Sequence, residues 1–348
     1  MIKIKNIYYM LSYAFQTLND KGYNKIATED FENTAELFSE ILTIGVSKQI
    51  KQGLVKDYID VTETTSSIRG KINITDSIKE QSIIKRQLNC TYDEFSVNCY
   101  LNQIIKSTMN LLLKSDISRK RKKKLKNLLM YFREVDLIDV KDINWKIRFD
   151  RNNQTYKMLI GVCYLAIEGL LQTTSKGEHK LLEFIDDQRM SRLYEKFVLN
   201  YYIREHPEIS ASASQIKWQL DDYNDFMLPK MQSDVYLEYE NNIFIIDTKY
   251  YSHTTQNYWG VNTVHSNNLY QIFTYVKNKE SEVNGKDYSV SGMLLYARTT
   301  ESIQPDNDYL MSGNKISVKT LDLNHDFNEI KNQLDSIIDV AFAPSKTT

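Results

Sequence analysis

Cysteine, proline and glycine are scarce in this sequence, which has 3 Cys, 4 Pro and 11 Gly in 348 residues. So little glycine and proline excludes collagen-like and low-complexity chains. Cys90, Cys99 and Cys163 form no Cys-x-x-Cys pair, and their odd number argues against a disulfide framework and a cysteine zinc site. We therefore expect reduced thiols and a cytoplasmic location.

An excess of charge and a long apolar segment are also missing. Lys and Arg number 44 and Asp and Glu 45, a net charge of -1, so nucleic-acid binding requires a local basic patch. The longest apolar run, residues 158–167, is about half of the roughly 20 residues that span a membrane. The sequence shows no secretory signal, no glycine-rich phosphate loop and no histidine zinc motif. We expect neither a membrane segment nor nucleotide hydrolysis by this chain.

The length and a hydrophobic content of 42% are sufficient for two domains. Apolar residues at helical spacing predict a mainly helical first half, and β-branched residues predict a small β element within it. The small, polar segment at residues 173–177 is the predicted linker. An α/β order follows it, so the predicted domains are 1–175 and 176–348. The predicted helices are residues 7–18, 37–44, 97–112, 122–135, 156–171, 190–204 and 268–277, and the predicted β segments are 58–75 and 292–297.

Two strand-like runs flank Asn241 and Asn242 and predict a β-hairpin. Paired asparagines tolerate the backbone angles of a tight turn, so the turn is placed at these two residues. With this turn, Asp234 faces Lys249, and the alternation of side chains brings Asp247 to the same side of the hairpin.

Two carboxylates held together repel each other unless a cation shares them, and Mg²⁺ prefers such oxygen ligands. A lysine beside the ion can orient or deprotonate an attacking water molecule. Asp234, Asp247 and Lys249 therefore predict metal-dependent phosphodiester hydrolysis. The alternative is an exposed Asp–Lys pair, which a bare Asp-x-Lys usually indicates. The apolar residues 243–246 favour the first interpretation, because Asp247 then ends a buried strand.

Two further segments supply candidate side chains. Gln271 and Tyr275 lie four residues apart, so they share one face of a predicted helix and can place a phosphate or the attacking water molecule. Glu195, on the predicted helix 190–204, is a candidate third metal ligand. The alternatives are ordinary packing for Tyr275 and a solvent-facing position for Glu195.

In order along the chain, Asp234, Asp247-Thr248-Lys249 and Gln271-x-x-x-Tyr275 resemble the PD-(D/E)xK nuclease superfamily and its RecB-like branch. The proline of that pattern is displaced, because Pro229 lies five residues before Asp234. Nearly the whole chain is similar to the McrC family. The segments that carry this second resemblance are IKNIYYMLSYAF near the start, RGKI at 69–72, LYEKF at 193–197, LPKMQSDV, IIDTKYY and NLYQIFTYV.

The McrC resemblance implies a nuclease subunit of a modification-dependent restriction system, with Mg²⁺-dependent cleavage of double-stranded DNA that contains modified cytosine. It also implies a partner, a hexameric McrB-like AAA+ GTPase, on which the amino-terminal half docks and whose GTP hydrolysis it stimulates. A chain with almost no net charge has little general attraction to DNA, so capture of the DNA by the partner agrees with this composition.

Two rival functions stay open: a nuclease subunit of a system that reads unmodified sequence, and a non-catalytic activator of the AAA+ motor. One basic run, Arg119–Lys126, can contact a DNA backbone or an acidic partner surface. A solvated helix face is the simpler interpretation of this run.

Overall fold

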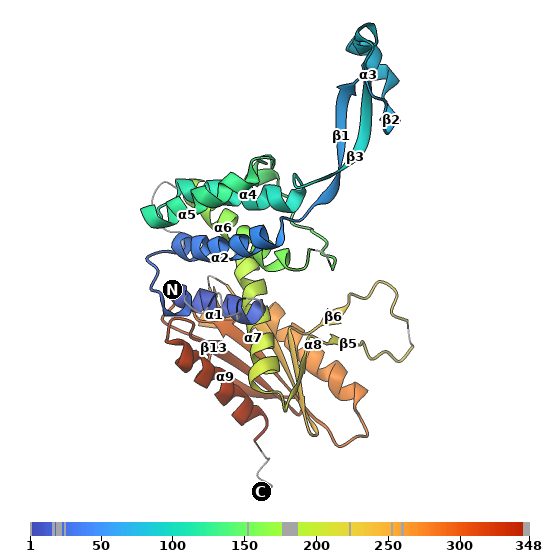
Figure 1. Cartoon of the computed structure of the whole chain (residues 1–348). Coiled ribbons are helices and arrows are strands. Elements are labelled where there is room, and N and C mark those ends of the chain that lie inside the picture. Colours follow the sequence, from blue (N-terminus) through green and yellow to red (C-terminus); the bar gives the residue numbers. More distant parts are fainter. Residues whose placement is uncertain are drawn as a thin grey trace. The chain divides into compact units, whose positions relative to one another are not determined.

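The computed structural model describes residues 2–15, 18, 23, 26–151, 153–175, 187–222, 224–251, 253–258 and 261–343 (Figure 1). The chain forms two compact units, one of Glu32–Glu178 and one that joins Met1–Phe31 to His179–Thr348. The predicted boundary after residue 175 lies close to the division after Glu178. Residues 1–31, which the sequence pattern groups with the amino-terminal half, pack with the carboxyl-terminal unit. Of the predicted linker, residues 173–175 are helical and residues 176–177 lie outside the described residues.

The unit of Glu32–Glu178 combines helices with a three-stranded antiparallel element. Its first helix begins after Asn33, whose side chain accepts a hydrogen bond from the Glu36 N–H, and ends at Gly53 with a positive φ of 91°. The helices predicted in this part of the chain are confirmed. Its helices are α2 (Thr34–Gln52), α3 (Ile74–Lys79), α4 (Tyr100–Lys114), α5 (Arg119–Leu129) and α6 (Tyr156–Ser175), with 3-10 turns η3 (Ser82–Lys85), η4 (Met130–Phe132) and η5 (Val140–Asp142).

The β element of this unit has the order β1-β3-β2, with β1 (Asp57–Thr65), β2 (Lys71–Ile72) and β3 (Leu88–Ser96). The sequence predicted the first two strands and missed β3. Gly70 has a φ of 65°, and a Cβ there would lie 2.3 Å from the Thr91 carbonyl oxygen. The turn before β2 therefore requires glycine.

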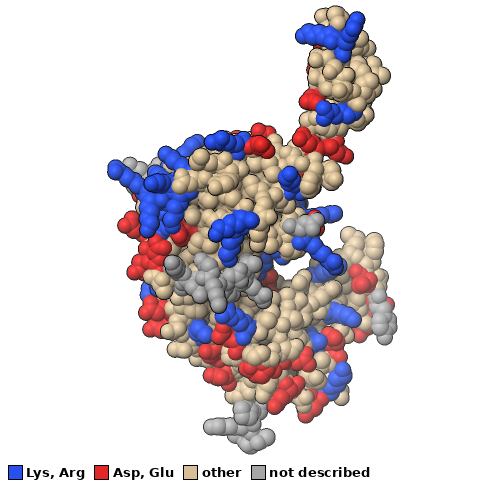
Figure 2. Space-filling view, viewed as in Figure 1, with Lys and Arg blue, Asp and Glu red and all other residues tan. Residues whose placement is uncertain are grey.

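Helix α5 carries the basic run and is fastened to α2 by a buried ion-pair network. Arg121 is 6% exposed and its guanidinium pairs with Glu36 and with Glu40. Lys124 adds an ion pair with Glu40 at 3.0 Å. Two of the basic side chains are thus used internally, and the other Lys and Arg side chains gather on the surface over α5 (Figure 2).

The other unit is built on a six-stranded mixed sheet of order β12-β13-β11-β8-β7-β4. Strands β8, β11 and β13 are parallel, and β7 and β4 continue the sheet antiparallel. The mixed α/β architecture is confirmed. The strands are β4 (Ser210–Ser212), β7 (Val235–Tyr239), β8 (Asn242–Lys249), β11 (Ser289–Ala297), β12 (Asn307–Met311) and β13 (Asn314–Leu321), with two small pairs, β5 (Gln215–Ile216) with β6 (Met231–Gln232) and β9 (Thr255–Tyr258) with β10 (Val261–Val264).

Helix α8 (Ser266–Glu282) covers one face of this sheet and forms its main apolar core. Gly292 of β11 allows the close approach, because a Cβ there would lie 2.6 Å from the Val276 side chain. Alternate β8 side chains point to the opposite face, where Phe244 packs edge-on against Phe342 at the end of α9 (Phe327–Ala341). The packing against the sheet therefore fixes the distance between α8 and the end of β8.

Helix α1 (Ile4–Ala14) belongs to this unit because its contacts lie far along the chain. The Asn6 amide donates to the carbonyl oxygens of Leu323 and His325 at 2.7 and 2.8 Å. The Tyr13 hydroxyl donates to Glu205 at the end of α7 (Asp187–Glu205) at 2.8 Å. No helix in the described part of the chain is long and apolar enough to cross a membrane.

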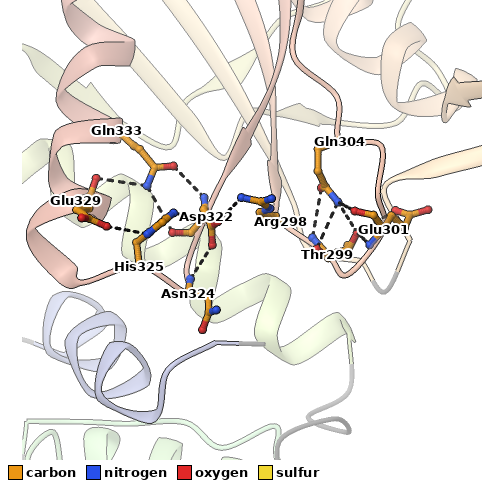
Figure 3. A network of polar contacts seen from close by, with 9 residues as sticks. All are labelled: Arg298, Thr299, Glu301, Gln304, Asp322, Asn324, His325, Glu329 and Gln333. Atoms are coloured by element: carbon orange, nitrogen blue, oxygen red, sulfur yellow. Dashed lines mark hydrogen bonds and ion pairs between the residues drawn. The ribbon is translucent and has the colours of Figure 1, made fainter.

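Polar networks fix the loops that follow the parallel strands (Figure 3). Glu301, after β11, accepts hydrogen bonds from the N–H and hydroxyl of Thr254 at 2.6 and 2.7 Å and from the hydroxyls of Thr255 and Thr299. Burial alone would raise the pKa of Glu301, but these donors lower it to about 2. One carboxylate therefore ties the loop after β8 to the loop after β11.

We expect Glu301→Gln to lower the free energy of unfolding at pH 7 by on the order of 2 kcal/mol. The reason is that the folded state stabilises the ionised carboxylate of Glu301 more than the unfolded state does. A lowered pKa gives stability that is complete above the ordinary value of 4.5 and is lost as the pH falls toward about 2. Urea unfolding from pH 7 to pH 3 measures the difference. The exposed Glu240→Gln has the same charge change and serves as the control. An equal loss at pH 3 and pH 7 would contradict the assignment.

Candidate active site

The candidate side chains converge at the carboxyl end of β8. Asp234 immediately precedes β7, Asp247 lies within β8 and Lys249 is its last residue. Gln271 and Tyr275 come from α8, which packs against β8 and β11. The structure thus brings together five of the six residues singled out from the sequence.

The predicted register of the hairpin is wrong by two residues. Val235 pairs with Ile246 and Tyr239 with Asn242, so the turn lies at Glu240 and Asn241. Only Glu240 has a positive φ, 51°, so the turn does not need the tolerance of two consecutive asparagines. A shift of two residues keeps the parity of the pairing, and Asp234 therefore still lies beside Asp247.

Asp234 is oriented by Thr248. The backbone N–H and the hydroxyl of Thr248 both donate to Oδ2 of Asp234, at 2.7 and 2.8 Å. Burial raises the pKa of Asp234, and the two hydrogen bonds oppose the rise. Both donors bind Oδ2 of Asp234, so the other carboxylate oxygen, Oδ1, is available to a further ligand. The sequence reasoning missed Thr248, whose only signal was a hydroxyl between Asp247 and Lys249.

Asp247 is a buried carboxylate, 1% exposed, in contact with Lys249. Burial raises its pKa to about 6, against the lowering effect of the Lys249 charge, and the Asp234 charge raises it further. Oδ2 of Asp247 lies 2.5 Å from Nζ of Lys249. Within the described residues, no donor is aligned to hydrogen bond with that oxygen. A buried oxygen with this single ionic contact is suited to bind a cation.

Lys249 and Gln271 close a ring of polar contacts around Asp247. Nζ of Lys249 donates to Oε1 of Gln271 at 3.0 Å, and Nε2 of Gln271 lies 3.3 Å from Oδ1 of Asp247 and 2.9 Å from the Tyr275 hydroxyl. Burial lowers the pKa of Lys249, but the charge of Asp247 outweighs it, so the pKa is raised overall. Lys249 is therefore a cation near neutral pH.

Glu195 of α7 lies within electrostatic range of both aspartates but does not complete a metal cluster. It is half-buried, and burial followed by the charges of Asp234 and Asp247 raises its pKa, whereas Lys196 and Arg192 lower it. Across the described ranges, no group of three or more His, Cys, Asp and Glu side chains could hold a metal ion. The predicted third-ligand role of Glu195 stays a prediction.

The carboxylates of Asp234 and Asp247 fit a hard divalent cation. Their oxygens are the preferred ligand type of Mg²⁺, and both pKa values are raised, as expected of neighbouring buried negative charges that a cation would stabilise.

Over residues 3–297 the sequence matches the family described as McrBC 5-methylcytosine restriction system component. The chain belongs to this family. The resemblance to the McrC family is thereby confirmed, and the chain is a component of a 5-methylcytosine restriction system.

One relative matches almost the whole of this chain. It is the type IV methyl-directed restriction enzyme EcoKMcrBC of Escherichia coli (strain K12), 26% identical over 345 residues, which are 97% of this chain and 98% of the relative.

Two solved structures from Thermococcus gammatolerans are also similar to this member of the McrBC family. A half-complex of a tetradecameric assembly of McrB AAA+ hexamers with bound McrC is 15% identical, with a TM-score of 0.46 over 94% of this chain and 75% of that chain. The McrBC complex determined by cryo-EM is 17% identical, with a TM-score of 0.37 over 58% of each chain.

We expect Lys249→Met to raise the pKa of Asp247 above about 6, because the neutral side chain removes the charge that lowers it while burial and Asp234 remain. Titration of the aspartate carboxyl carbons by NMR measures the change. Lys249→Arg keeps the charge and should leave the value near 6. An unchanged pKa in the methionine variant would show that the ion pair does not control Asp247.

Proposed function

We propose that this chain is the nuclease subunit of its restriction system and hydrolyses double-stranded DNA that contains modified cytosine. The observation that carries the proposal is the Lys249–Asp247 contact at the end of a buried strand, with Gln271 bridging both side chains. An exposed structural pair has neither this burial nor an amide placed between its members. The family description and the methyl-directed E. coli relative support modified DNA as the substrate.

We assign the sheet to the PD-(D/E)xK nuclease type. Asp234 enters from the start of β7, Asp247 and Lys249 share one face of β8, and Gln271 and Tyr275 descend from α8. This is the order of acid, acid-x-lysine and glutamine–tyrosine elements that the superfamily resemblance implies.

Asp234 and Asp247 would hold Mg²⁺, and Glu195 stands as a further candidate ligand. When bound, the ion supplies Lewis-acid stabilisation of charge on the phosphoryl oxygens. Thr248 fixes the orientation of Asp234 through two hydrogen bonds. Lys249, held protonated by Asp247, donates hydrogen bonds, so its role is to orient the attacking water and stabilise negative charge rather than to remove a proton.

Gln271 and Tyr275 would position this lysine and the substrate phosphate. The Gln271 side chain accepts from Lys249 with its oxygen and approaches Asp247 and Tyr275 with its nitrogen. One amide thus fixes the lysine relative to the carboxylate, and the Tyr275 hydroxyl completes the same polar cluster.

The proposal includes a partner, an McrB-like AAA+ GTPase hexamer. This chain has no glycine-rich phosphate loop, so GTP hydrolysis requires another polypeptide. Its net charge of -1 gives little general attraction to DNA, which favours capture of the substrate by that partner. The helical unit with the β1-β3-β2 element is the proposed docking and stimulating part.

We expect the wild-type chain, mixed with its cognate GTPase, GTP and Mg²⁺, to cut methylated plasmid and to leave unmethylated plasmid intact. Lys249→Ala should reduce the rate by about 10²–10³-fold, the usual loss when one positioned donor to the transition-state charge is removed. Gel electrophoresis of both plasmids measures cutting, and the exposed Lys286→Ala is the matched control.

Three results separate the rival functions. Equal cutting of both plasmids would keep the nuclease site but indicate a system that reads unmodified sequence. No cutting that depends on Lys249 would favour a non-catalytic activator of the motor. A folded Asp247→Ala variant that loses the partner as well as cleavage would contradict the separation of the nuclease site from docking.

We expect Thr248→Val to weaken divalent-cation binding by about 10-fold or more, because groups that orient a metal ligand commonly contribute this much. Valine keeps the branched shape and the backbone N–H but removes the hydroxyl that donates to Asp234. Isothermal titration of the full chain with Mn²⁺ measures the affinity. Thr320→Val on β13, outside this cluster, is the control, and equal affinities of all three proteins would exclude the orienting role.

A further inference from the structure

The basic run on α5 forms a surface that the nuclease site does not use. Arg121, Lys124, Leu125 and Leu128 occupy the inner side of the helix, through burial or through the ion pairs with α2. The 3.6-residue period places the remaining basic residues on the outer side. These residues define the cationic face: Arg119, Lys120, Lys122, Lys123 and Lys126.

The cationic face has no compensating acid. Within the described part of the chain, none of its five side chains forms an ion pair, although the same helix contributes Arg121 and Lys124 to pairs with Glu36 and Glu40. Figure 2 shows Lys and Arg side chains gathered on the surface over α5. The face is therefore a local positive field on a chain whose net charge is -1.

This arrangement works against the helix itself. Arg119 and Lys123, and likewise Lys122 and Lys126, are like charges four residues apart, which destabilises a helix. The buried pairing of Arg121 with Glu36 and Glu40 and the apolar contacts of Leu125 hold α5 in place in spite of this repulsion. The result is a rigid element that presents repelling cations outward, which a bound polyanion would relieve.

The chemistry of the face favours nucleic acid over protein. Besides the five cations, the outer arc of α5 carries Asn127, and the exposed Met130 and Tyr131 follow in the turn η4 at its end. Protein interfaces are depleted of lysine relative to the rest of the surface. Contacts to nucleic-acid phosphates instead use lysine and arginine as charges, and four of these five residues are lysines.

We propose that the cationic face of α5 binds the phosphate backbone of duplex DNA without reading its sequence. The face would be a second DNA contact, on the unit of Glu32–Glu178, distinct from the nuclease residues of the sheet. The choice of DNA as the polyanion rests on the proposed function. Binding itself needs neither the metal ion nor Lys249.

The test measures binding of the full chain to a fluorescent, unmethylated duplex of about 30 base pairs, without divalent ions, at several salt concentrations. We expect the triple variant Lys120→Gln, Lys123→Gln, Lys126→Gln to reduce the steepness of log affinity against log salt by about 2 to 3, near 0.9 for each phosphate that the variant no longer neutralises. The affinity at low salt should fall by at least about 10-fold.

Two matched variants control for charge and for folding. Replacement of the same three lysines by arginine should keep the wild-type slope. Replacement of the exposed Lys51, Lys141 and Lys286 by glutamine removes equal charge elsewhere and should also keep it. Thermal unfolding of the arginine triple and of the control glutamine triple should coincide with that of the wild type. The α5 glutamine triple should unfold at the same or a slightly higher temperature, because it relieves repulsion between like charges along the helix.

The proposal would be overturned if the two glutamine triples gave equal slopes of log affinity against log salt. It would also be overturned if the α5 glutamine triple kept the wild-type slope but no longer bound its GTPase partner. The second result would identify an acidic protein surface as the ligand. Because no cleavage is measured, failure here is distinct from failure of the nuclease assignment, which Lys249→Ala tests.

Discussion

The contact between Lys249 and Asp247 is the interaction on which the rest of the site depends. A carboxylate that is 1% exposed is unfavourable as an anion unless a cation accompanies it. Lys249 supplies that cation from two residues along the same strand, and Gln271 binds both members of the pair. The sheet must therefore hold α8 at one distance, which the small residue Gly292 makes possible.

The same contact leaves the site electrostatically incomplete. Asp234 and Glu195 add negative charge around Asp247, and all three carboxyl groups have raised pKa values. Lys249 alone does not balance Asp234 and Asp247, whereas Lys196 and Arg192 already oppose the charge of Glu195. The local charge thus favours an additional cation, and the orientation of Asp234 by Thr248 shows that one carboxylate is already fixed in direction before a cation binds.

The sequence predicted the elements whose signals are local. Apolar periodicity located α1, α2 and α4 to α8 but not α3 or α9, and an Asp-x-Lys after four apolar residues located the end of β8. The turn was misplaced because Glu240, rather than an asparagine, adopts the positive φ. Strand β3 was missed because its nine residues, LNCTYDEFS, include one β-branched residue, Thr91, against five in β1. The role of Thr248 depends on Asp234, fourteen residues away, and no local pattern reports it.

The attachment of α1 has a consequence for the timing of assembly during translation. The Asn6 amide finds its acceptors 317 and 319 residues later in the chain. At the usual synthesis rate of about 5–20 residues per second, roughly 15–60 seconds separate the two partners at the ribosome. Meanwhile the unit of Glu32–Glu178 can fold from contacts within its own sequence. The unit that carries the candidate nuclease residues is therefore completed last, after the unit proposed to engage the partner.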